Sequence, residues 1–461
     1  MPCAQGPAYQ QLASAIQKLI LEGQVGLHVR MPAERELAPE LAVSRTTLTA
    51  AYGVLRDTGY LHSRRGSGTW TALPAEQTMR PLSAPDACID LTTASLGIPP
   101  RDLAQAYAQA GPRVEGIAST SGYHPFGLPE LRAAIADRYT RRGLPTRSDQ
   151  ILITTGAQQA LTLTLELLCT AGDRVLVESP TYPNALAAIR RAGLRAVSTP
   201  VDDNGWNIGA LEQALRQDAP RLAYLIPHFH NPIGSLMPAD ECRRVLDATR
   251  RSGTWLVADE TLTDLALDTP VPTPFAATES AGTADHVLTV GSLSKSHWAG
   301  LRIGWVRATP GFVANLSVLR MAHDLGGPVV EQLLAVSLIE QSDEQHAGRV
   351  ARVREQRAAL AEALRHHLPQ WRWQSPVGGL SLWVDLGQPI ASVLAERAEE
   401  RGVRIVGGGR FGVDPGTFDR RLRIPYALPP STLGDAVSRL AEVLGHSTEL
   451  ADSTARGGWV V

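Results

Sequence analysis

Apolar residues recur along this chain at helical spacing near the N-terminus and as short runs further on. Near the N-terminus they fall three or four positions apart, at Tyr9, Leu12, Ile16, Leu19 and Ile20. This spacing gives a helix one apolar face. Gly23 is a plausible stop for such a helix, so the sequence predicts an amphipathic helix over residues 8 to 22.

The segment from Pro32 to Trp70 predicts two more helices and a hairpin. Glutamates after Pro32 suit a helix N-terminus, a tight turn follows at residues 42–43, and Ser44 is a good N-cap for the next helix. The side chains of that helix form an apolar face of Leu48, Tyr52 and Leu55 and an opposite face of Arg45, Thr46 and Thr49. Residues 59 to 70 alternate around an Arg-Gly-Ser-Gly turn, as a two-stranded hairpin does. The predicted order is helix, turn, helix, wing.

A different pattern begins after residues 73–88, which carry three prolines and little periodicity and therefore predict a linker. Short apolar or β-branched runs alternate there with helical segments, and the runs are 151–155, 174–178, 221–226, 254–258 and 286–290. This alternation predicts an α/β domain with a mostly parallel sheet and helices on both faces. Ligands of such sheets bind beyond the carboxyl ends of the strands, in the loops that lead into helices.

Composition narrows the class of protein. With 461 residues, 44% hydrophobic and 20% charged, the chain is long enough for two or three domains and suits a soluble protein with a substantial core. Its net charge of −2 predicts no partner, so any nucleic-acid site must be a local patch. The four cysteines lack the spacing of disulfide or zinc frameworks, and we expect no metal. Neither a membrane span nor a signal peptide is indicated, which predicts a cytoplasmic protein.

Lysine usage identifies the first candidate for chemistry. Only Lys18 and Lys295 are lysines, and every other basic residue is arginine or histidine. A guanidinium does not lose its proton at accessible pH and cannot form a Schiff base, so the lysine kept at position 295 suggests covalent chemistry. Around it lie hydroxyls and a guanidinium suited to a phosphate dianion, from Ser292, Ser294 and Arg302. The combination points to pyridoxal phosphate; the alternative is a surviving lysine on a Ser/Gly loop.

Two of the strand-to-helix loops carry groups that suit such a cofactor. After the run at 151–155, a helix begins whose first N–H groups, at Ala157 and Gln158, are free to bind an anion. Many strands end in this way, so the signal is weak when taken singly. Tyr182 lies on a loop between two prolines, where its ring either stacks on a flat cofactor or caps the rim of the core.

Two later loops add an amide and a carboxylate. Asn231 is able to donate to a phenolate oxygen, although Asn-Pro by itself only signals a turn. Asp259 directly follows a buried strand, and a buried carboxylate needs a partner. A protonated pyridine nitrogen is such a partner, and this pair makes the cofactor an electron sink. His228 and His230 are interpreted as hydrogen-bonding loop residues without a role in the site.

The N-terminal segment resembles the GntR-type winged helix-turn-helix through the motifs P-A-E-R-E-L-A, V-S-R-T-T-L, A-Y-x-x-L, G-Y-L and R-R-G-S-G-T-W. The resemblance implies operator DNA as a partner and contacts from Arg35, Ser44, Arg45, Thr46, Thr47, Arg65 and Gly66. Residues 1–72 hold seven basic positions (18, 30, 35, 45, 56, 64, 65) and five acidic ones (22, 34, 36, 40, 57). So small an excess does not by itself distinguish a DNA-binding domain from a helical protein-interaction module.

From about residue 89 to 448 the chain resembles the fold-type I aminotransferases, through G-A-Q-Q-A, S-P-T-Y-P, H-N-P-x-G, V-A-D-E, S-L-S-K and G-L-R-I-G-W. The resemblance gives each candidate a role. Phosphate is held by Ala157, Gln158, Ser292, Ser294 and Arg302, the ring is contacted by Tyr182, Asn231 and Asp259, and the aldimine forms on Lys295.

The same resemblance assigns two further residues and shows one departure. Arg423 takes the role of the arginine that grips a substrate carboxylate, with Arg421 as the competing choice, and Tyr123 reaches the phosphate of a neighbouring subunit, which implies a dimer. Many relatives carry a tyrosine two or three positions after the aspartate, where Thr261 and Leu262 stand here. Threonine is too short to reach the ring oxygen equally, so we expect the aldimine to form but turnover to be slow or absent.

The whole chain resembles the MocR (GabR-like) regulators of the GntR family. That layout predicts a winged helix-turn-helix at 1–72, a linker at 73–88, an aminotransferase-like domain at 89–450 and a tail at 451–461. It implies a regulator that senses an amine or amino acid through the Lys295 aldimine. The alternatives are an active aminotransferase with an accessory DNA-binding domain and a structural domain that has lost its cofactor, which intact Lys295, Asp259 and Asn231 oppose.

Overall fold

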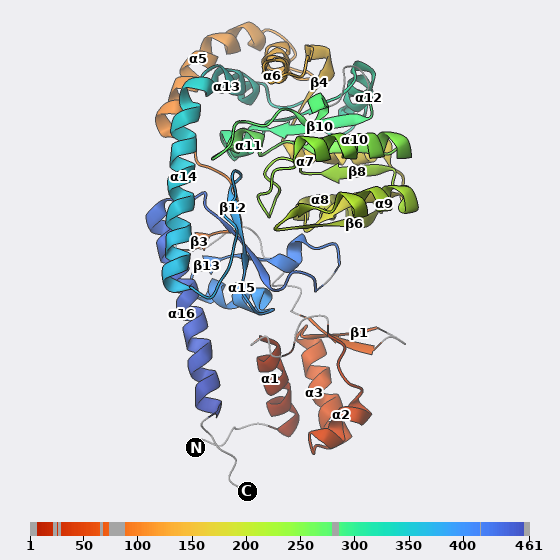
Figure 1. The fold of residues 1–461 in the computed structure, drawn as a ribbon, viewed down its shortest axis with the longest axis vertical. Coiled ribbons are helices and arrows are strands. Elements are labelled where there is room, and N and C mark those ends of the chain that lie inside the picture. The colour runs from red at the N-terminus through yellow and green to blue at the C-terminus, as the bar shows by residue number, and fades with distance from the viewer. Residues whose placement is uncertain are drawn as a thin grey trace.

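The computed structural model of the chain describes residues 7–21, 25, 29–64, 68–72, 88–278, 285–414 and 416–455. The first domain lies at one end of the long axis, and the largest sheet lies toward the other end (Figure 1). The predicted DNA contacts Arg65 and Gly66, nearly all of the predicted linker and the last six positions of the predicted tail lie outside the described residues.

The first domain has the predicted order of helices and hairpin. Its elements are α1 (Ala8–Leu21), α2 (Glu34–Glu40), α3 (Arg45–Asp57) and the antiparallel pair β1 (Leu61–Arg64) and β2 (Gly68–Thr71). Ile16 and Ile20 of α1 pack against Leu48 and Leu55 of α3 in one small core. Leu19, which the helical spacing placed on the apolar face, is 37% exposed, because the buried stripe passes through residues 13, 16 and 20.

The largest sheet has eight strands in the order β4-β11-β10-β9-β8-β5-β6-β7. The predicted runs correspond to β4 (Ile151–Thr154), β5 (Arg174–Ser179), β8 (Leu222–Leu225), β9 (Trp255–Asp259) and β10 (Val287–Ser292). Pairs from β10 through β9, β8 and β5 to β6 are parallel, which confirms the mostly parallel sheet. Three antiparallel pairings involve strands that the apolar runs did not predict: β6 (Arg195–Asp202), β7 (Gly205–Trp206) and β11 (Gly304–Arg307).

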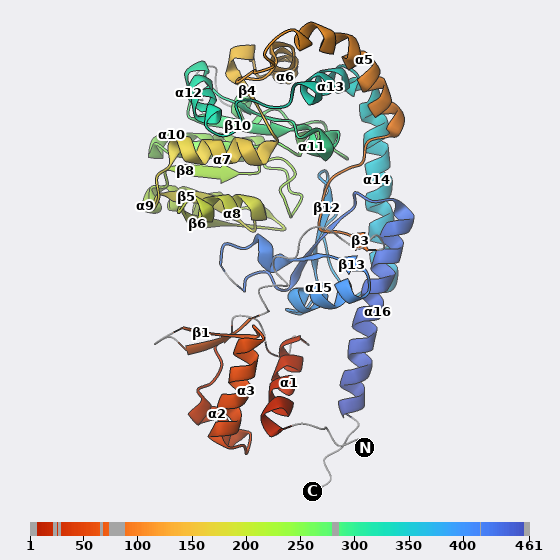
Figure 2. The same cartoon turned by 180° about the vertical axis from the view of Figure 1, so that it is seen from behind.

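Helices cover both faces of this sheet, as Figures 1 and 2 show from opposite sides. One face carries α7 (Ala157–Leu168), α8 (Pro183–Arg191) and α12 (Pro310–Met321). The other carries α6 (Pro129–Arg141), α9 (Ile208–Asp218), α10 (Ala239–Ser252) and α13 (Val329–Glu340), and α5 (Pro100–Ala118) packs on α13. Alternate residues of each strand enter the two cores, so the central strands are apolar throughout.

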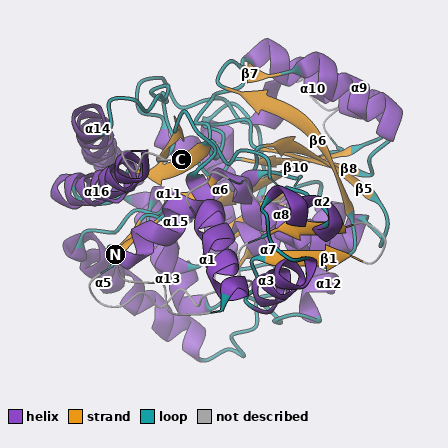
Figure 3. Ribbon diagram, turned by 90° about the horizontal axis from the view of Figure 1, so that it is seen from below, coloured by secondary structure: helices purple, strands orange, loops and turns teal. Residues whose placement is uncertain are grey.

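A smaller lobe is formed mostly by the residues after α13, together with β3 from the start of the domain. Its strands are β12 (Ser381–Asp385), β15 (Arg421–Pro425) and β14 (Val406–Gly407), with β3 (Ile89–Asp90) paired to β13 (Val403–Arg404), and its helices are α14 (Ser342–His367), α15 (Ala391–Glu400) and α16 (Pro430–Ala455). Figure 3 shows α14 and α16 side by side. Because α16 continues past residue 450, the predicted start of the tail falls inside a helix. Among the described residues, no helix is long and apolar enough to cross a membrane.

Candidate cofactor site and DNA-contacting helix

Lys295 lies on α11 (Leu293–Ser296), a single helical turn directly after β10. Ser292 caps this turn, because its hydroxyl oxygen accepts a hydrogen bond from the Ser294 amide at 3.1 Å. The Ser292 hydroxyl is also 2.8 Å from the carbonyl of Ile303, to which it donates. A hydroxyl has only one proton to donate, and that of Ser292 is already used within the protein. Ser294 is therefore the better side-chain donor for an anion.

The amine of Lys295 is held against a backbone carbonyl. Its Nζ donates to the Ala94 carbonyl at 2.7 Å. Burial lowers the pKa of Lys295 to about 8; the guanidinium groups of Arg423 and Arg302 also lower it, and Asp259 opposes them. A lysine with this pKa has an appreciable neutral fraction near neutral pH, which is the form that attacks an aldehyde.

Asp259, the last residue of β9, is 6% exposed and is bonded on both oxygens. Its Oδ2 accepts from the Tyr224 hydroxyl at 2.6 Å, and its Oδ1 accepts from the Thr261 amide at 3.0 Å. Burial raises the pKa of Asp259, while these hydrogen bonds counteract it. Tyr224 was not predicted from the sequence. Strand register would have indicated it, since Tyr224 pairs with Val257 and so lies on the sheet face of Asp259, two residues further on.

Three of the predicted phosphate donors, Ala157, Gln158 and Arg302, lie at the start of α7. Gly156 precedes this helix at φ 86°, and its first-turn N–H groups, including those of Ala157 and Gln158, have no partner within the helix. Arg302 is exposed and donates to the Thr155 carbonyl at 3.1 Å. A Cβ on Gly156 would stand 2.9 Å from an Arg302 nitrogen, so the guanidinium lies directly over the helix start.

Tyr182 and Asn231 occupy two neighbouring loops and are both partly buried. The Tyr182 hydroxyl accepts a hydrogen bond from the Asn184 amide at 2.9 Å. Burial raises the pKa of Tyr182, and among its charged neighbours Asp259 raises it and Arg423 lowers it. Tyr182 is therefore close enough to Asp259 and Arg423 for their charges to act on it.

Arg423 and Arg421, the two candidates for the carboxylate, differ in what they already bind. Arg421 pairs with Asp203 at 3.0 Å and with Asp385 at 4.0 Å. Arg423 is 7% exposed, donates to the Thr92 carbonyl and stands over the Phe411 ring. Its Nε is buried and has no hydrogen-bond partner among the described residues. An unused buried donor favours Arg423 as the anion-binding group.

Tyr123 differs from the buried candidates in its exposure. Its side chain is 65% exposed, on the loop that precedes α6. That exposure suits a residue that reaches a second copy of the chain, and the role of Tyr123 stays a prediction.

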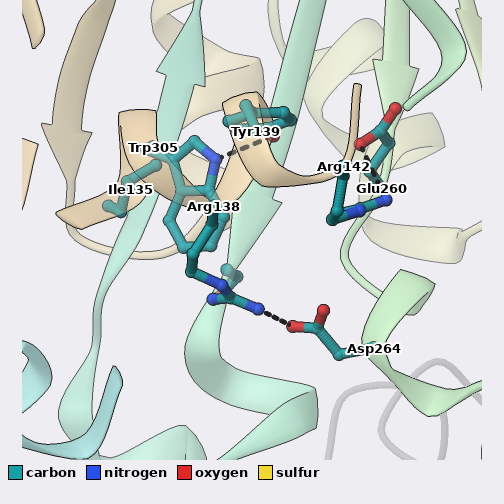
Figure 4. Close-up of a pocket in the computed structure, with 8 residues that line it drawn as sticks. Ile135, Arg138, Tyr139, Arg142, Glu260, Asp264 and Trp305 are labelled. Atoms are coloured by element: carbon teal, nitrogen blue, oxygen red, sulfur yellow. Dashed lines mark hydrogen bonds and ion pairs between the residues drawn. The ribbon is translucent and has the colours of Figure 1, made fainter. Parts of the chain in front are cut away.

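A small cavity lies near Ser292, and it is lined by Ile135, Arg138, Tyr139, Arg142, Glu260, Asp264, Ser292 and Trp305 (Figure 4). Arg138 donates to Asp264 at 2.6 Å, and Arg142 lies 3.9 Å from Glu260. Burial would raise the pKa of Asp264, but Arg138 and Arg142 outweigh it and hold the pKa well below its usual range. With room of about 10 Å³, the cavity accommodates about one water and is a structural charge cluster rather than a ligand site.

In the first domain, α3 presents the predicted DNA contacts at its N-terminus. The Ser44 hydroxyl oxygen accepts from the Thr47 amide at 3.1 Å, which confirms the predicted cap. Ser44, Arg45 and Thr46 are exposed, Thr47 is partly buried, and Arg35 is exposed beside Glu36 at 3.6 Å. Thr46 lies opposite the apolar face of α3, and Ser44, Arg45 and Thr47 lie at the N-terminal end of the helix, which is the end that we expect to contact DNA.

The fold and the site together define a class of protein. A mostly parallel sheet places Lys295, Asp259, the α7 N-terminus and Arg302 at the ends of its strands, and a winged helix-turn-helix precedes it. The lysine would supply an amine, the aspartate a partner for a pyridine nitrogen, and the helix start a phosphate cradle. These donors fit pyridoxal phosphate.

Comparisons identify the family. Residues 89–440 match the class I and II aminotransferases, and residues 8–70 match the gntR family of bacterial regulatory proteins. The chain belongs to the class I and II aminotransferase family and carries the GntR DNA-binding domain in front, the layout of MocR-type transcriptional regulators. It is a DNA-binding regulator with a pyridoxal-phosphate-binding domain that takes an amino-acid ligand.

Relatives include regulators and enzymes. The chain is 29% identical over 400 residues to the probable rhizopine catabolism regulatory protein MocR of Rhizobium meliloti, covering 79% of this chain and 78% of that one. It is 34% identical over 330 residues to the 2-aminoadipate transaminase of Thermus thermophilus, covering 70% and 80% respectively. The crystal structure of the α-aminoadipate aminotransferase LysN from that organism aligns with a TM-score of 0.73 at 30% identity, covering 79% of this chain and 94% of LysN.

Proposed function

We propose that the chain is a cytoplasmic, dimeric regulator whose affinity for operator DNA changes when an amino acid binds at Lys295 and Arg423. The amino group of the effector takes the place of the Lys295 amine at the cofactor, and its carboxylate binds the unused donor of Arg423. Tyr123 completes the phosphate cradle of the partner subunit. The proposal retains the predicted domains, with the DNA-binding domain at 1–72, the linker at 73–88 and the ligand-binding domain from 89. Pyridoxal phosphate supplies an aldehyde that condenses with amines and a ring that withdraws electrons.

One observation carries the proposal: a single segment that follows the linker contacts both effector-binding groups. The Thr92 carbonyl accepts from Arg423, and the Ala94 carbonyl accepts from Lys295 at 2.7 Å. The Ser95 hydroxyl donates to the Ser294 carbonyl at 3.0 Å, which ties the same segment to the lysine turn. An effector carboxylate at the Nε of Arg423 would alter the bond from the same guanidinium to Thr92, and any reaction of Lys295 changes its bond to Ala94.

This segment leads back to the linker through β3. Ile89 and Asp90 pair with Val403 and Arg404 of β13, immediately before Thr92. A displacement at residues 92–95 is therefore only a few positions from the end of the linker. Coupling between two ligands of one protein is typically about 1 to 3 kcal/mol, or roughly 5- to 150-fold in affinity.

The test measures operator affinity and the visible spectrum of the holoprotein together, while single amino acids and amines are added. We expect a compound that changes the spectrum also to change operator affinity by roughly 5-fold or more. Arg423→Gln is the matched variant: it should keep DNA binding without effector and lose the response to amino acids but not to amines that lack a carboxylate. Unchanged operator affinity with every spectrally active compound would contradict the proposal.

An active aminotransferase is the second candidate. Its support is the 34% identity to a 2-aminoadipate transaminase, together with the intact Lys295 and Asp259. Thr261 opposes it, because its amide is bonded to Asp259 and its side chain is too short to replace the phenol of many relatives. Rapid, stoichiometric conversion of an amino acid to a keto acid, without any change in operator affinity, would favour this second function.

A further inference from the structure

Tyr224 has a polar contact that core packing does not require. The residue lies in the middle of the large sheet on β8, with 1% of its surface exposed. Its hydroxyl donates to Asp259 Oδ2 at 2.6 Å, while the opposite oxygen of Asp259 is held by the Thr261 amide. The carboxylate is thus fixed from two sides, by a phenol from the neighbouring strand and by its own loop.

We propose that Tyr224 is a positioning residue, which holds the Asp259 carboxylate in orientation and in its ionised form for the pyridine nitrogen of the cofactor. The inference rests on the proposed role of Asp259 and goes beyond the sensing function. Tyr224 acts through Asp259 and needs no contact of its own with the cofactor or the effector.

The alternative is a core tyrosine whose hydroxyl needs any acceptor. Tyr426 is a tyrosine of that kind: it is fully buried, and its hydroxyl donates to the Gly378 carbonyl at 3.3 Å. The acceptor of Tyr224 is an ionisable carboxylate. The hydrogen bond of Tyr224 is 2.6 Å long and that of Tyr426 is 3.3 Å long, a difference of 0.7 Å. Short hydrogen bonds to ionised acceptors are the stronger kind.

The surroundings of Asp259 explain why such a bond is needed. Four titratable groups interact electrostatically with Asp259. They are Glu178 on β5, Tyr182 at the start of α8, Tyr224 on β8 and Lys295 on α11. Burial raises the pKa of Asp259 most, and Glu178 raises it further, whereas the bonds from Tyr224 and Thr261 lower it. Without the Tyr224 hydroxyl, the carboxylate would protonate at a higher pH and lose its attraction for a pyridinium.

The experiment compares the dissociation constant of pyridoxal phosphate for the wild-type chain and for Tyr224→Phe, from about pH 6 to about pH 9. Phenylalanine keeps the buried ring and removes only the hydroxyl. We expect the ratio of the two constants to be near one at the alkaline end and to rise to roughly tenfold toward the acidic end. Titration of the cofactor itself affects both proteins equally and cancels in the ratio. Tyr426→Phe is the control, and its ratio should stay near one throughout.

A second comparison uses the Asp259→Asn background. If Tyr224 acts through Asp259, adding Tyr224→Phe to Asp259→Asn should cost no further affinity. A ratio near one at every pH, or an equal loss in both backgrounds, would show that Tyr224 only packs the core and overturn the proposal. If Asp259→Asn alone leaves the affinity unchanged, the roles of both residues fall, whereas the sensing function is decided separately by the operator titration.

Discussion

The helix α3, which is predicted to contact DNA, and the predicted site around Lys295 place their side chains in opposite surroundings. Ser44, Arg45 and Thr46 of the first domain are exposed, and the core is built from the other face of the helix. In the second domain, Asp259 and Arg423 are buried and Lys295 partly so, and each is already bonded to another part of the chain.

Because of this difference, the effects of substitutions should combine differently in the two regions. Exposed groups on α3 that do not contact one another should contribute to DNA binding almost independently. Around Lys295 the groups are coupled, because the pKa of the lysine depends on Arg423, Asp259 and Arg302. Substitutions there should be non-additive and dependent on pH.

Lys295→Ala should have the largest effect, because the large domain has no other lysine and Lys18 is the only other lysine of the chain. The variant should lose the yellow colour and all borohydride-reducible cofactor. Lys18→Ala, the matched control, should keep both. Mass spectrometry after reduction is the measurement. A reducible linkage that persists in Lys295→Ala would show that Lys295 is not the residue that binds the cofactor.

Asp259→Asn should come next. Loss of a buried charge partner should weaken pyridoxal phosphate binding by roughly 100-fold or more.

The stability of the protein without cofactor should change in the opposite direction. Because burial raises the pKa of Asp259, its ionised form lowers the stability of the fold at neutral pH. This loss of stability disappears as the pH falls below that pKa. Melting temperatures should therefore show Asp259→Asn more stable than wild type near pH 8, with a gap that closes in acid. A wild type that is the more stable at neutral pH would contradict this.

Local signals predicted much of this molecule. The Ser44 cap, the apolar face of α3 and the strands β4, β5, β8, β9 and β10 follow from residues close together in sequence, and the fold class and the cofactor are confirmed. The individual roles of the site residues stay predictions.

Long-range pairings were beyond these signals. The bond between Tyr224 and Asp259 depends on the parallel register of β8 and β9, which no local pattern encodes. The contacts of residues 92–95 with Lys295 and Arg423 join positions more than 200 apart in sequence. The strand β6 was missed because its residues are largely exposed or only partly buried, as suits a strand near the sheet edge.

Arg45→Ala tests the exposed side of the comparison. Affinity for a specific operator should fall by about 1 to 3 kcal/mol if Arg45 contacts a base, or fall uniformly with a flatter salt dependence if it contacts phosphate. Arg101, whose side chain is 89% exposed in the large domain, provides the control, and Arg101→Ala should leave DNA binding unchanged. Fluorescence anisotropy at several salt concentrations measures both. Equal affinity of Arg45→Ala and wild type at all salt concentrations would remove α3 from the DNA interface.

The pH dependence of cofactor attachment tests the coupling between Lys295 and its charged neighbours. Because the pKa of Lys295 is lowered to about 8, the neutral amine should increase roughly tenfold between about pH 7 and about pH 9, and the attachment rate with it. In Arg423→Gln the midpoint should move upward, since a cation that disfavours the ammonium is removed. Stopped-flow absorbance gives the profile. A midpoint near that of an ordinary lysine in the wild-type chain would mean that the amine is not held in the buried site.

The smallest effect is expected at Ser44, and it concerns the protein without DNA. Removing the cap in Ser44→Ala leaves the Thr47 amide without its 3.1 Å acceptor and should cost about 1 kcal/mol of local stability, whereas Ser44→Gly should cost only a few tenths. Hydrogen exchange of the α3 amides in the full chain reports this locally, and Ser44→Ala should exchange roughly five times faster than wild type. Exchange around Lys295 should be unchanged in both variants, because the described residues of the two regions belong to separate packing cores. If exchange in the large domain also accelerated, the DNA-contacting helix and the cofactor site would be coupled even without a ligand.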